Sequence, residues 1–186
     1  EAYYNLGNIL KDLCDLKEAE VSIRKAIEIK PDFSGAHLNL GNIMKDLGNL
    51  LEAELSYRKA IELNPNLAGA HSNLGIILKD LGKLKEAELS TRKAIEIKSN
   101  YAEAYYNLGI ILNDLGKSKE AELSYRKAIE LNPSFAEAHS NLGIMLNDLG
   151  KLQEAELSYR KAIKLKPDFA LAHYNRGKVL SDLGQL

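Results

Sequence analysis

The chain has 186 residues, of which 45% are hydrophobic and 27% charged, and this composition is typical of a folded domain rather than a disordered or membrane-embedded one. Its 25 basic and 26 acidic residues give a formal net charge of −1, which argues against a nucleic-acid partner because phosphate binding normally requires a basic surface. No apolar run approaches the roughly 18 residues of a membrane span, so we expect no membrane partner.

The first segment begins at Glu1 rather than at a methionine, and its residues already follow helical spacing. We therefore expect the chain to be part of a longer parent, whose targeting signals it does not reveal. The single Cys14 cannot form an internal disulfide, which favours a cytoplasmic location without identifying the compartment. Cys14 occupies a position at which later segments carry glycine, and we interpret it as a replaced turn residue rather than a reactive thiol.

A period of 34 residues organises the whole chain. Its clearest markers are Gly7, Gly41, Gly75, Gly109, Gly143 and Gly177. Prolines with the same spacing mark the ends of most units, at Pro31, Pro65, Pro133 and Pro167, with Ser99 in the remaining place. The sequence thus predicts one domain over 1–186, composed of repeats 1–33, 34–67, 68–101, 102–135 and 136–169 and a half repeat 170–186.

Each repeat has the pattern of two helices. In 102–135, Leu108 and Leu112 lie at helical spacing, and Gly116 then provides the left-handed cap that ends the first helix. Tyr125 belongs to the apolar stripe of the second helix, which Pro133 terminates. Because so small a pair cannot bury its own apolar face, the repeats are expected to stack as an all-α solenoid.

The repeat resembles the tetratricopeptide repeat (TPR) family over the whole chain. In 34–67 the residues that carry the resemblance are His37, Leu40, Gly41, Ala53, Tyr57, Ala60 and Pro65. The departures from the family pattern are Ile23 and Thr91 at the aromatic position, Ser99 for proline and Arg176 for leucine. The resemblance implies a right-handed superhelix of helix-turn-helix hairpins whose first helices line a concave groove. It also implies protein or peptide binding, with no catalysis and no cofactor.

Two polar residues recur in every first helix. The sixth position of the repeat, which we name the Asn ladder, holds Asn5, Asn39, Asn73, Asn107, Asn141 and Asn175. The thirteenth position, which we name the Asp ladder, holds Asp12, Asp46, Asp80, Asp114, Asp148 and Asp182. Seven residues is close to two helical turns, so both ladders lie on the same face of their helices. The Asn ladder and the first five members of the Asp ladder are the candidate peptide-binding residues.

The chemistry of the ladders suits an extended peptide. A side-chain amide both donates and accepts, so it pairs with a peptide backbone of any sequence. Packed helices lie about 8–10 Å apart and an extended chain advances about 3.3 Å per residue, so one asparagine would meet about every third residue. The ladders resemble the TPR groove of O-GlcNAc transferase and SPINDLY-type proteins. That resemblance implies that the asparagines grip the substrate backbone and that the aspartates tune selection, here towards Lys, Arg, Ser or Thr.

The predicted function is a protein–protein interaction scaffold that binds extended peptide segments. One alternative is the substrate-recruiting arm of a larger glycosyltransferase-like or other modifying enzyme. Another is a spacer or self-assembly unit, because recent duplication could have copied the ladders passively. Ser56, Arg58 and Lys59 of the second helix recur as faithfully as the ladders do.

Two other readings are weaker. The fourth position holds His37, His71, His139 and His173. Residues at one position of successive repeats are spread along the stack and cannot converge on one ion, so we expect packing rather than a metal site. A clamp for acidic chaperone tails would need three cations, but its positions hold Tyr4, Gly69 and Asn73.

The last half repeat ends without a second helix. Val179, Leu180 and Leu183 are therefore expected to be partly uncovered, while Arg176 and Lys178 make that helix more polar than its siblings. A solenoid normally has polar ends, so we expect a tendency towards end-to-end self-association.

Overall fold

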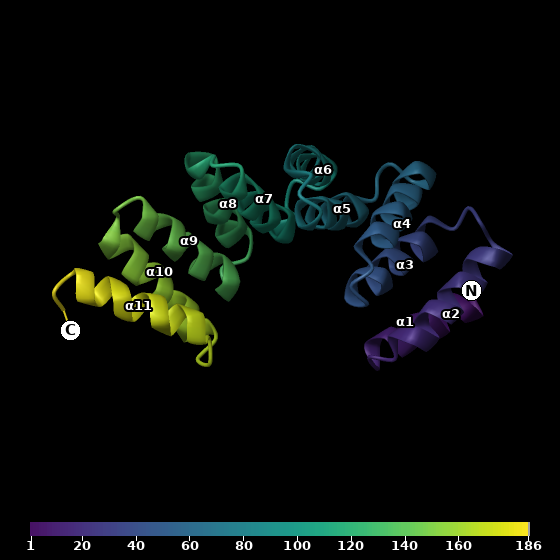
Figure 1. The fold of residues 1–186 in the computed structure, drawn as a ribbon, viewed down its shortest axis with the longest axis horizontal. Helices are drawn as coiled ribbons and strands as arrows, with labels where there is room; N and C mark the ends of the chain where they lie inside the picture. Colours follow the sequence, from purple (N-terminus) through teal and green to yellow (C-terminus); the bar gives the residue numbers. More distant parts are fainter. Residues whose placement is uncertain (186) are drawn as a thin grey trace. The chain divides into compact units, whose positions relative to one another are not determined.

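The computed structural model describes residues 1–185, which form eleven α-helices and contain no strand, so the predicted all-α class is confirmed (Figure 1). The first helices of the repeats are α1 (Ala2–Asp12), α3 (Ser34–Asp46), α5 (Ala68–Asp80), α7 (Ala102–Asp114), α9 (Ala136–Asp148) and α11 (Ala170–Asp182). The second helices are α2 (Leu16–Ile29), α4 (Leu50–Leu63), α6 (Leu84–Ile97), α8 (Ser118–Leu131) and α10 (Leu152–Leu165).

The chain divides into two compact units. Unit 1 is Glu1–Ser99 and contains α1 to α6, and unit 2 is Asn100–Leu186 and contains α7 to α11. Within each unit, a first helix packs against the second helix of its own hairpin and against the second helix that precedes it. Each unit is therefore a stretch of helical solenoid, in which every hairpin buries apolar surface against the next. The grouping of all repeats into a single domain stays a prediction.

Glycine at the eighth position of the repeat brings the two helices of a hairpin close together. A Cβ built on Gly109 would lie 2.6 Å from the ring of Tyr125, and one on Gly143 would lie 2.7 Å from the ring of Tyr159. Both rings are buried. The contact between glycine and tyrosine therefore sets the distance between the two helices. It also leaves room for the tyrosine ring to extend across the core.

The turn that follows each first helix contains one residue in the left-handed region. Five of these residues are glycines, with φ between +66° and +79°: Gly48, Gly82, Gly116, Gly150 and Gly184. In the first hairpin the residue is Cys14, with φ 62°. The prediction that Cys14 replaces a turn glycine is thus confirmed, and the side chain is exposed.

The prediction for the last helix is wrong for Val179, which is only 1% exposed. Its position faces the preceding hairpin, and α11 packs on α10 and α9, so this side of the helix is covered. Leu180 and Leu183 are half-buried. Arg176, which replaces the usual leucine, donates from Nε to Glu156 Oε1 at 2.9 Å.

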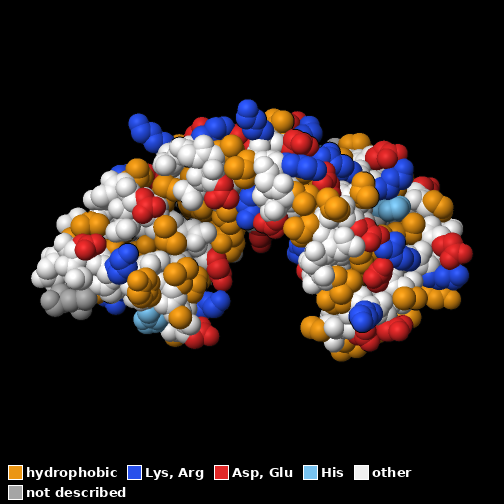
Figure 2. Space-filling model, in the orientation of Figure 1, with side chains coloured by type: hydrophobic (Ala, Val, Ile, Leu, Met, Phe, Trp, Pro, Cys, Tyr) orange, Lys and Arg blue, Asp and Glu red, His pale blue; other side chains and the backbone are white. Residues whose placement is uncertain are grey.

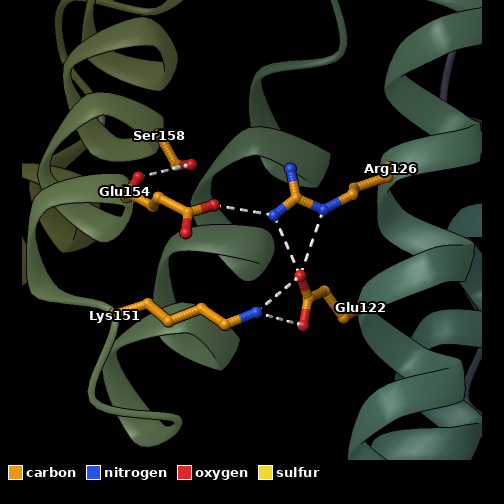
Figure 3. A network of polar contacts seen from close by, with 5 residues as sticks. All are labelled: Glu122, Arg126, Lys151, Glu154 and Ser158. Atoms are coloured by element: carbon orange, nitrogen blue, oxygen red, sulfur yellow. Dashed lines mark hydrogen bonds and ion pairs between the residues drawn. The ribbon is translucent and has the colours of Figure 1, made fainter.

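Ion pairs join successive second helices within a unit. In unit 2, Arg126 contacts Glu122 on its own helix and Glu154 on α10, each at 2.9 Å, and Lys151 Nζ lies 3.0 Å from Glu122 (Figure 3). In unit 1, Arg58, Glu54, Glu86 and Lys83 repeat the arrangement. The recurrence of arginine on the second helix thus has a structural role, which is to link neighbouring repeats.

Charged and hydrophobic side chains are interspersed over the visible surface of both units (Figure 2). Over residues 1–185, no helix combines the length and apolar character that crossing a membrane would require.

Candidate functional site

The Asn ladder lies on the first helices as predicted by its spacing. Asn39, Asn73, Asn107, Asn141 and Asn175 are half-buried, and Asn5 is exposed. We use the term ladder face for the face of the first helices that carries the Asn ladder, the ninth position of the repeat and the Asp ladder. Half-burial places the amides where they have a fixed environment and are still reachable from solvent.

Neighbouring repeats join their ladder side chains through hydrogen bonds. Asn39 Nδ2 donates to Asn8 Oδ1 at 2.5 Å, and Asn73 Nδ2 donates to Asn42 Oδ1 at 2.8 Å. In unit 2, Asn141 Nδ2 donates to the Tyr106 hydroxyl at 3.2 Å. Each of these amides donates one N–H to the preceding repeat, which orients the side chain and leaves its carbonyl oxygen available to other partners.

The Asp ladder lies at the helix ends. Every first helix ends at its ladder aspartate, and the aspartates are exposed: Asp12, Asp46, Asp80, Asp114, Asp148 and Asp182. A carboxylate there meets the negative end of the helix dipole, which costs about 0.3–1 kcal/mol. Helix stability therefore does not explain the recurrence of aspartate at this position.

The tyrosine of the second helix also reaches the ladder face. Tyr57 donates its hydroxyl hydrogen to Asn42 Oδ1 at 2.9 Å. Burial, with a further contribution from Asp46, raises the pKa of Tyr57. In the last full repeat, burial and the nearby charge of Asp148 raise the pKa of Tyr159 to about 12. These hydroxyls are therefore neutral hydrogen-bonding groups at the centre of the ladder face.

The two units differ at the twelfth position of the repeat. In unit 1 it is lysine, and Lys11, Lys45 and Lys79 lie beside their ladder aspartates with Nζ–Oδ1 distances of 3.7, 3.5 and 2.8 Å. In unit 2 it is asparagine or serine. Among the described residues, no cation pairs with Asp114 or Asp148. The ladder face is therefore locally neutral in unit 1 and negative in unit 2.

The ninth position holds Asn8, Asn42 and Ile76 in unit 1 and Ile110, Ile144 and Lys178 in unit 2. The side chains of Ile110 and Ile144 border a pocket of about 170 Å³. We name it the unit 2 pocket; its lining residues are Ile110, Asn113, Tyr125, Asn141, Ile144 and Met145. The pocket places one ladder asparagine beside apolar side chains.

The histidines do not form a metal site. Each ring lies with Nε2 at 2.9–3.2 Å from the carbonyl oxygen of the proline six residues earlier: the pairs are His37–Pro31, His71–Pro65, His139–Pro133 and His173–Pro167. Over the described part of the chain, no three His, Cys, Asp or Glu side chains are close enough to hold a metal ion. The histidines instead tie each first helix to the loop before it.

Two larger hollows lie between successive second helices rather than on the ladder face. One, of about 540 Å³, is bordered by α4, α5 and α6 and includes His71 and Leu89. The other, of about 450 Å³, repeats it in unit 2 with His139 and Leu157. Their charged walls, such as Arg58, are already engaged in ion pairs, so volume alone does not make them the better site.

Sequence reasoning missed Tyr57, Tyr125, Asn8 and Asn42 as parts of the site. From the sequence, the tyrosines are predicted to be core residues, and their rings are indeed buried. Only the structure shows that the ring spans the core and that its hydroxyl, as in Tyr57, reaches the first helix. A signal was available for the ninth position, which changes from asparagine in the first two repeats to isoleucine in the next three.

The repeated helical hairpins, which share one polar face, show that the chain is a helical repeat protein. Models of the TPR repeat match residues 41–82, 77–116 and 143–184, and tetratricopeptide repeat models match 1–33, 102–135 and 124–156. The chain belongs to the tetratricopeptide repeat family.

Solved structures agree with this assignment. YrrB is 26% identical with a TM-score of 0.73, over 94% of this chain and 90% of its own. MamA is 26% identical with a TM-score of 0.76, over 88% of this chain and 96% of its own. PilF of Pseudomonas aeruginosa is 21% identical with a TM-score of 0.90, over 99% of this chain and 84% of its own, and shows the fold alone. No curated protein matched the chain.

Proposed function

We propose that this protein is a protein–protein interaction scaffold whose ladder face binds extended peptide segments. The observation that carries the proposal is the way in which the ladder asparagines are held. All but Asn5 are half-buried, and Asn39, Asn73 and Asn141 are oriented by a hydrogen bond to the preceding repeat. Such pre-orientation lowers the ordering cost of binding a flexible ligand.

The groups that remain suit a peptide backbone. The Oδ1 atoms of Asn39 and Asn141 accept no hydrogen bond from a described residue, so each can accept from a peptide N–H. The second N–H of Asn39 can donate to a peptide carbonyl. Because these contacts read the backbone, the affinity depends little on the ligand side chains, which is the behaviour expected of a broad-specificity scaffold.

Two similarities support the proposal. YrrB is described as a TPR protein with an unusual peptide-binding site. The two ladders also resemble those of the O-GlcNAc transferase and SPINDLY-type grooves, in which asparagines hold the substrate backbone. The Asp ladder adds the charge that would select basic or hydroxyl-bearing ligand residues, since its carboxylates are exposed and their position is unfavourable for the helix.

A peptide array tests the proposal. A random-sequence array is probed with the intact chain and with a variant in which Asn39, Asn73, Asn107 and Asn141 are changed to alanine. We expect the intact chain to bind many extended peptides and the variant to lose at least about tenfold in affinity, as four backbone contacts of about 0.5–1.5 kcal/mol each would predict. Alanine is a better helix former than asparagine, so circular dichroism should show retained helix.

The matched control changes one side chain per repeat on the second helices. Its substitutions, all to alanine, are at Lys59, Lys93, Lys127 and Lys161. We expect this control to bind like the intact chain. If the ladder variant and the control bind alike, the Asn ladder is not the peptide site, and a spacer function becomes the better account.

A further inference from the structure

We propose that unit 2 holds a subsite for a peptide segment in which an aliphatic side chain lies next to a lysine or arginine, and that the matching place in unit 1 is closed by its own side chains. The inference rests on the proposed function and specifies the ligand chemistry of the same face. It follows from three differences between the units, in shape, in hydrogen bonding and in charge.

The shape of the subsite comes from the unit 2 pocket. Its volume of about 170 Å³ is several times the roughly 30 Å³ that one water molecule occupies in the liquid. Ile110, Ile144 and Met145 line it with apolar surface. An aliphatic ligand side chain would remove this surface from water, while Asn141 at the rim pairs with the ligand backbone.

The charge comes from the two aspartates that follow the isoleucines. Asp114 lies four residues after Ile110 and Asp148 four residues after Ile144, so each carboxylate is one turn further along the same face. One turn is about 6 Å of helix rise, which the flexible four-carbon stem of a lysine can span. No described cation neutralises either aspartate, so a basic side chain next to the aliphatic one meets uncompensated negative charge.

Hydrogen bonding closes the matching place in unit 1. There the residue in place of Ile110 is Asn42, whose Oδ1 accepts from both Tyr57 and Asn73. The polar side chain thus bridges the two groups between which a ligand side chain would have to insert. Lys45, in place of Asn113, lies 3.5 Å from Asp46. A basic ligand would therefore find less charge here, and an aliphatic one would have to break two hydrogen bonds.

The chain itself supplies matched variants for the test. Ile110→Asn with Asn113→Lys gives unit 2 the residues of unit 1, and Asn42→Ile with Lys45→Asn gives unit 1 the residues of unit 2. Both pairs occur at these positions in other repeats of the chain, so both variants are expected to fold, which circular dichroism verifies.

Binding of fluorescently labelled glycine–serine peptides with a central Leu-Lys, Leu-Glu or Gly-Lys step is measured by anisotropy. We expect the intact chain to bind Leu-Lys about fivefold more tightly than either of the others, as one ion pair plus a buried side chain suggests. The preference over Leu-Glu should shrink as salt screens the aspartates, whereas the preference over Gly-Lys, which comes from burial of the leucine, should persist. Both preferences should disappear in Ile110→Asn/Asn113→Lys and increase in Asn42→Ile/Lys45→Asn.

The outcomes separate the two proposals. Equal binding of the three peptides, or a Leu-Lys preference that survives Ile110→Asn/Asn113→Lys, would overturn the subsite and leave a peptide-binding ladder face intact. If neither these peptides nor any on the random array bind the intact chain, the proposed function itself fails, and the subsite with it.

Discussion

At the scale of single residues, the turn of the first hairpin carries a backbone cost that the other turns avoid. Cys14 has φ 62°, a left-handed conformation in which a side chain costs about 1 kcal/mol. We predict that Cys14→Gly raises the free energy of unfolding by about 1 kcal/mol, as measured by urea denaturation. The side chain is exposed, so its removal should cost little packing.

The reverse substitution is the control. An added Cβ at Gly116 would meet no atom within 4 Å, so any effect of Gly116→Ala arises from the backbone alone. With φ at 73°, Gly116→Ala should lower the free energy of unfolding by about 1 kcal/mol. If neither substitution changes the free energy of unfolding, the left-handed backbone at these turns carries no cost for a side chain, and the prediction is wrong.

At the scale of helices, the eighth-position glycine is required only where a second helix covers it. We predict that Gly109→Ala lowers the free energy of unfolding by about 1–3 kcal/mol, because its Cβ would lie 2.6 Å from the buried Tyr125 ring. A Cβ added to Gly177, on the uncovered face of α11, would meet no atom within 4 Å. Gly177→Ala should therefore raise the free energy of unfolding by about 0.8–1 kcal/mol through helix propensity. Thermal melts of the two variants should shift in opposite directions, and parallel shifts would contradict the packing role.

The ion pairs between second helices make stability depend on pH. Hydrogen bonding from Lys83, assisted by Arg58, lowers the pKa of Glu54. A lowered folded-state pKa contributes stability above the unfolded value of about 4.3, and this contribution is lost as the pH falls through the folded-state pKa. We predict that Glu54→Gln lowers the free energy of unfolding by about 1 kcal/mol at neutral pH and has no effect once the carboxyl is protonated.

Denaturation at a series of pH values measures this effect. Glu62→Gln is the matched control, since that side chain is 67% exposed and, among the described residues, pairs with Lys59 on its own helix alone. It should change stability little at any pH. A loss in Glu54→Gln that persists unchanged in acid would mean that packing, not charge, is responsible.

At the scale of the whole molecule, the 34-residue period of the sequence was enough to predict the helices, but it did not predict the contacts between repeats. Gly, Pro and the apolar spacing mark each helix within a few neighbouring residues, so the all-α repeat followed from local pattern alone. The bonds that orient the ladder join residues far apart in the chain, such as Asn39 and Asn8, which are 31 positions apart. Their partners depend on how closely two hairpins approach, and side-chain volume in the core sets that distance.

The same scale governs the predicted self-association. Leu6 and Ile9 on α1 are 45% and 57% exposed, whereas Leu40 and Ile43, at the same positions on α3, are buried by the second helix that precedes them. Burying such apolar surface against another copy is favourable by about 25 cal/mol per Å² before the costs of association.

We predict an average mass that rises with protein concentration in sedimentation equilibrium, and that Leu6→Lys/Ile9→Lys keeps the protein monomeric. Leu55→Lys removes a leucine that is 68% exposed in the middle of unit 1 and should leave the association unchanged. A monomeric mass for the intact chain at high concentration, or association abolished by Leu55→Lys instead, would show that the exposed face of α1 is not what joins the copies.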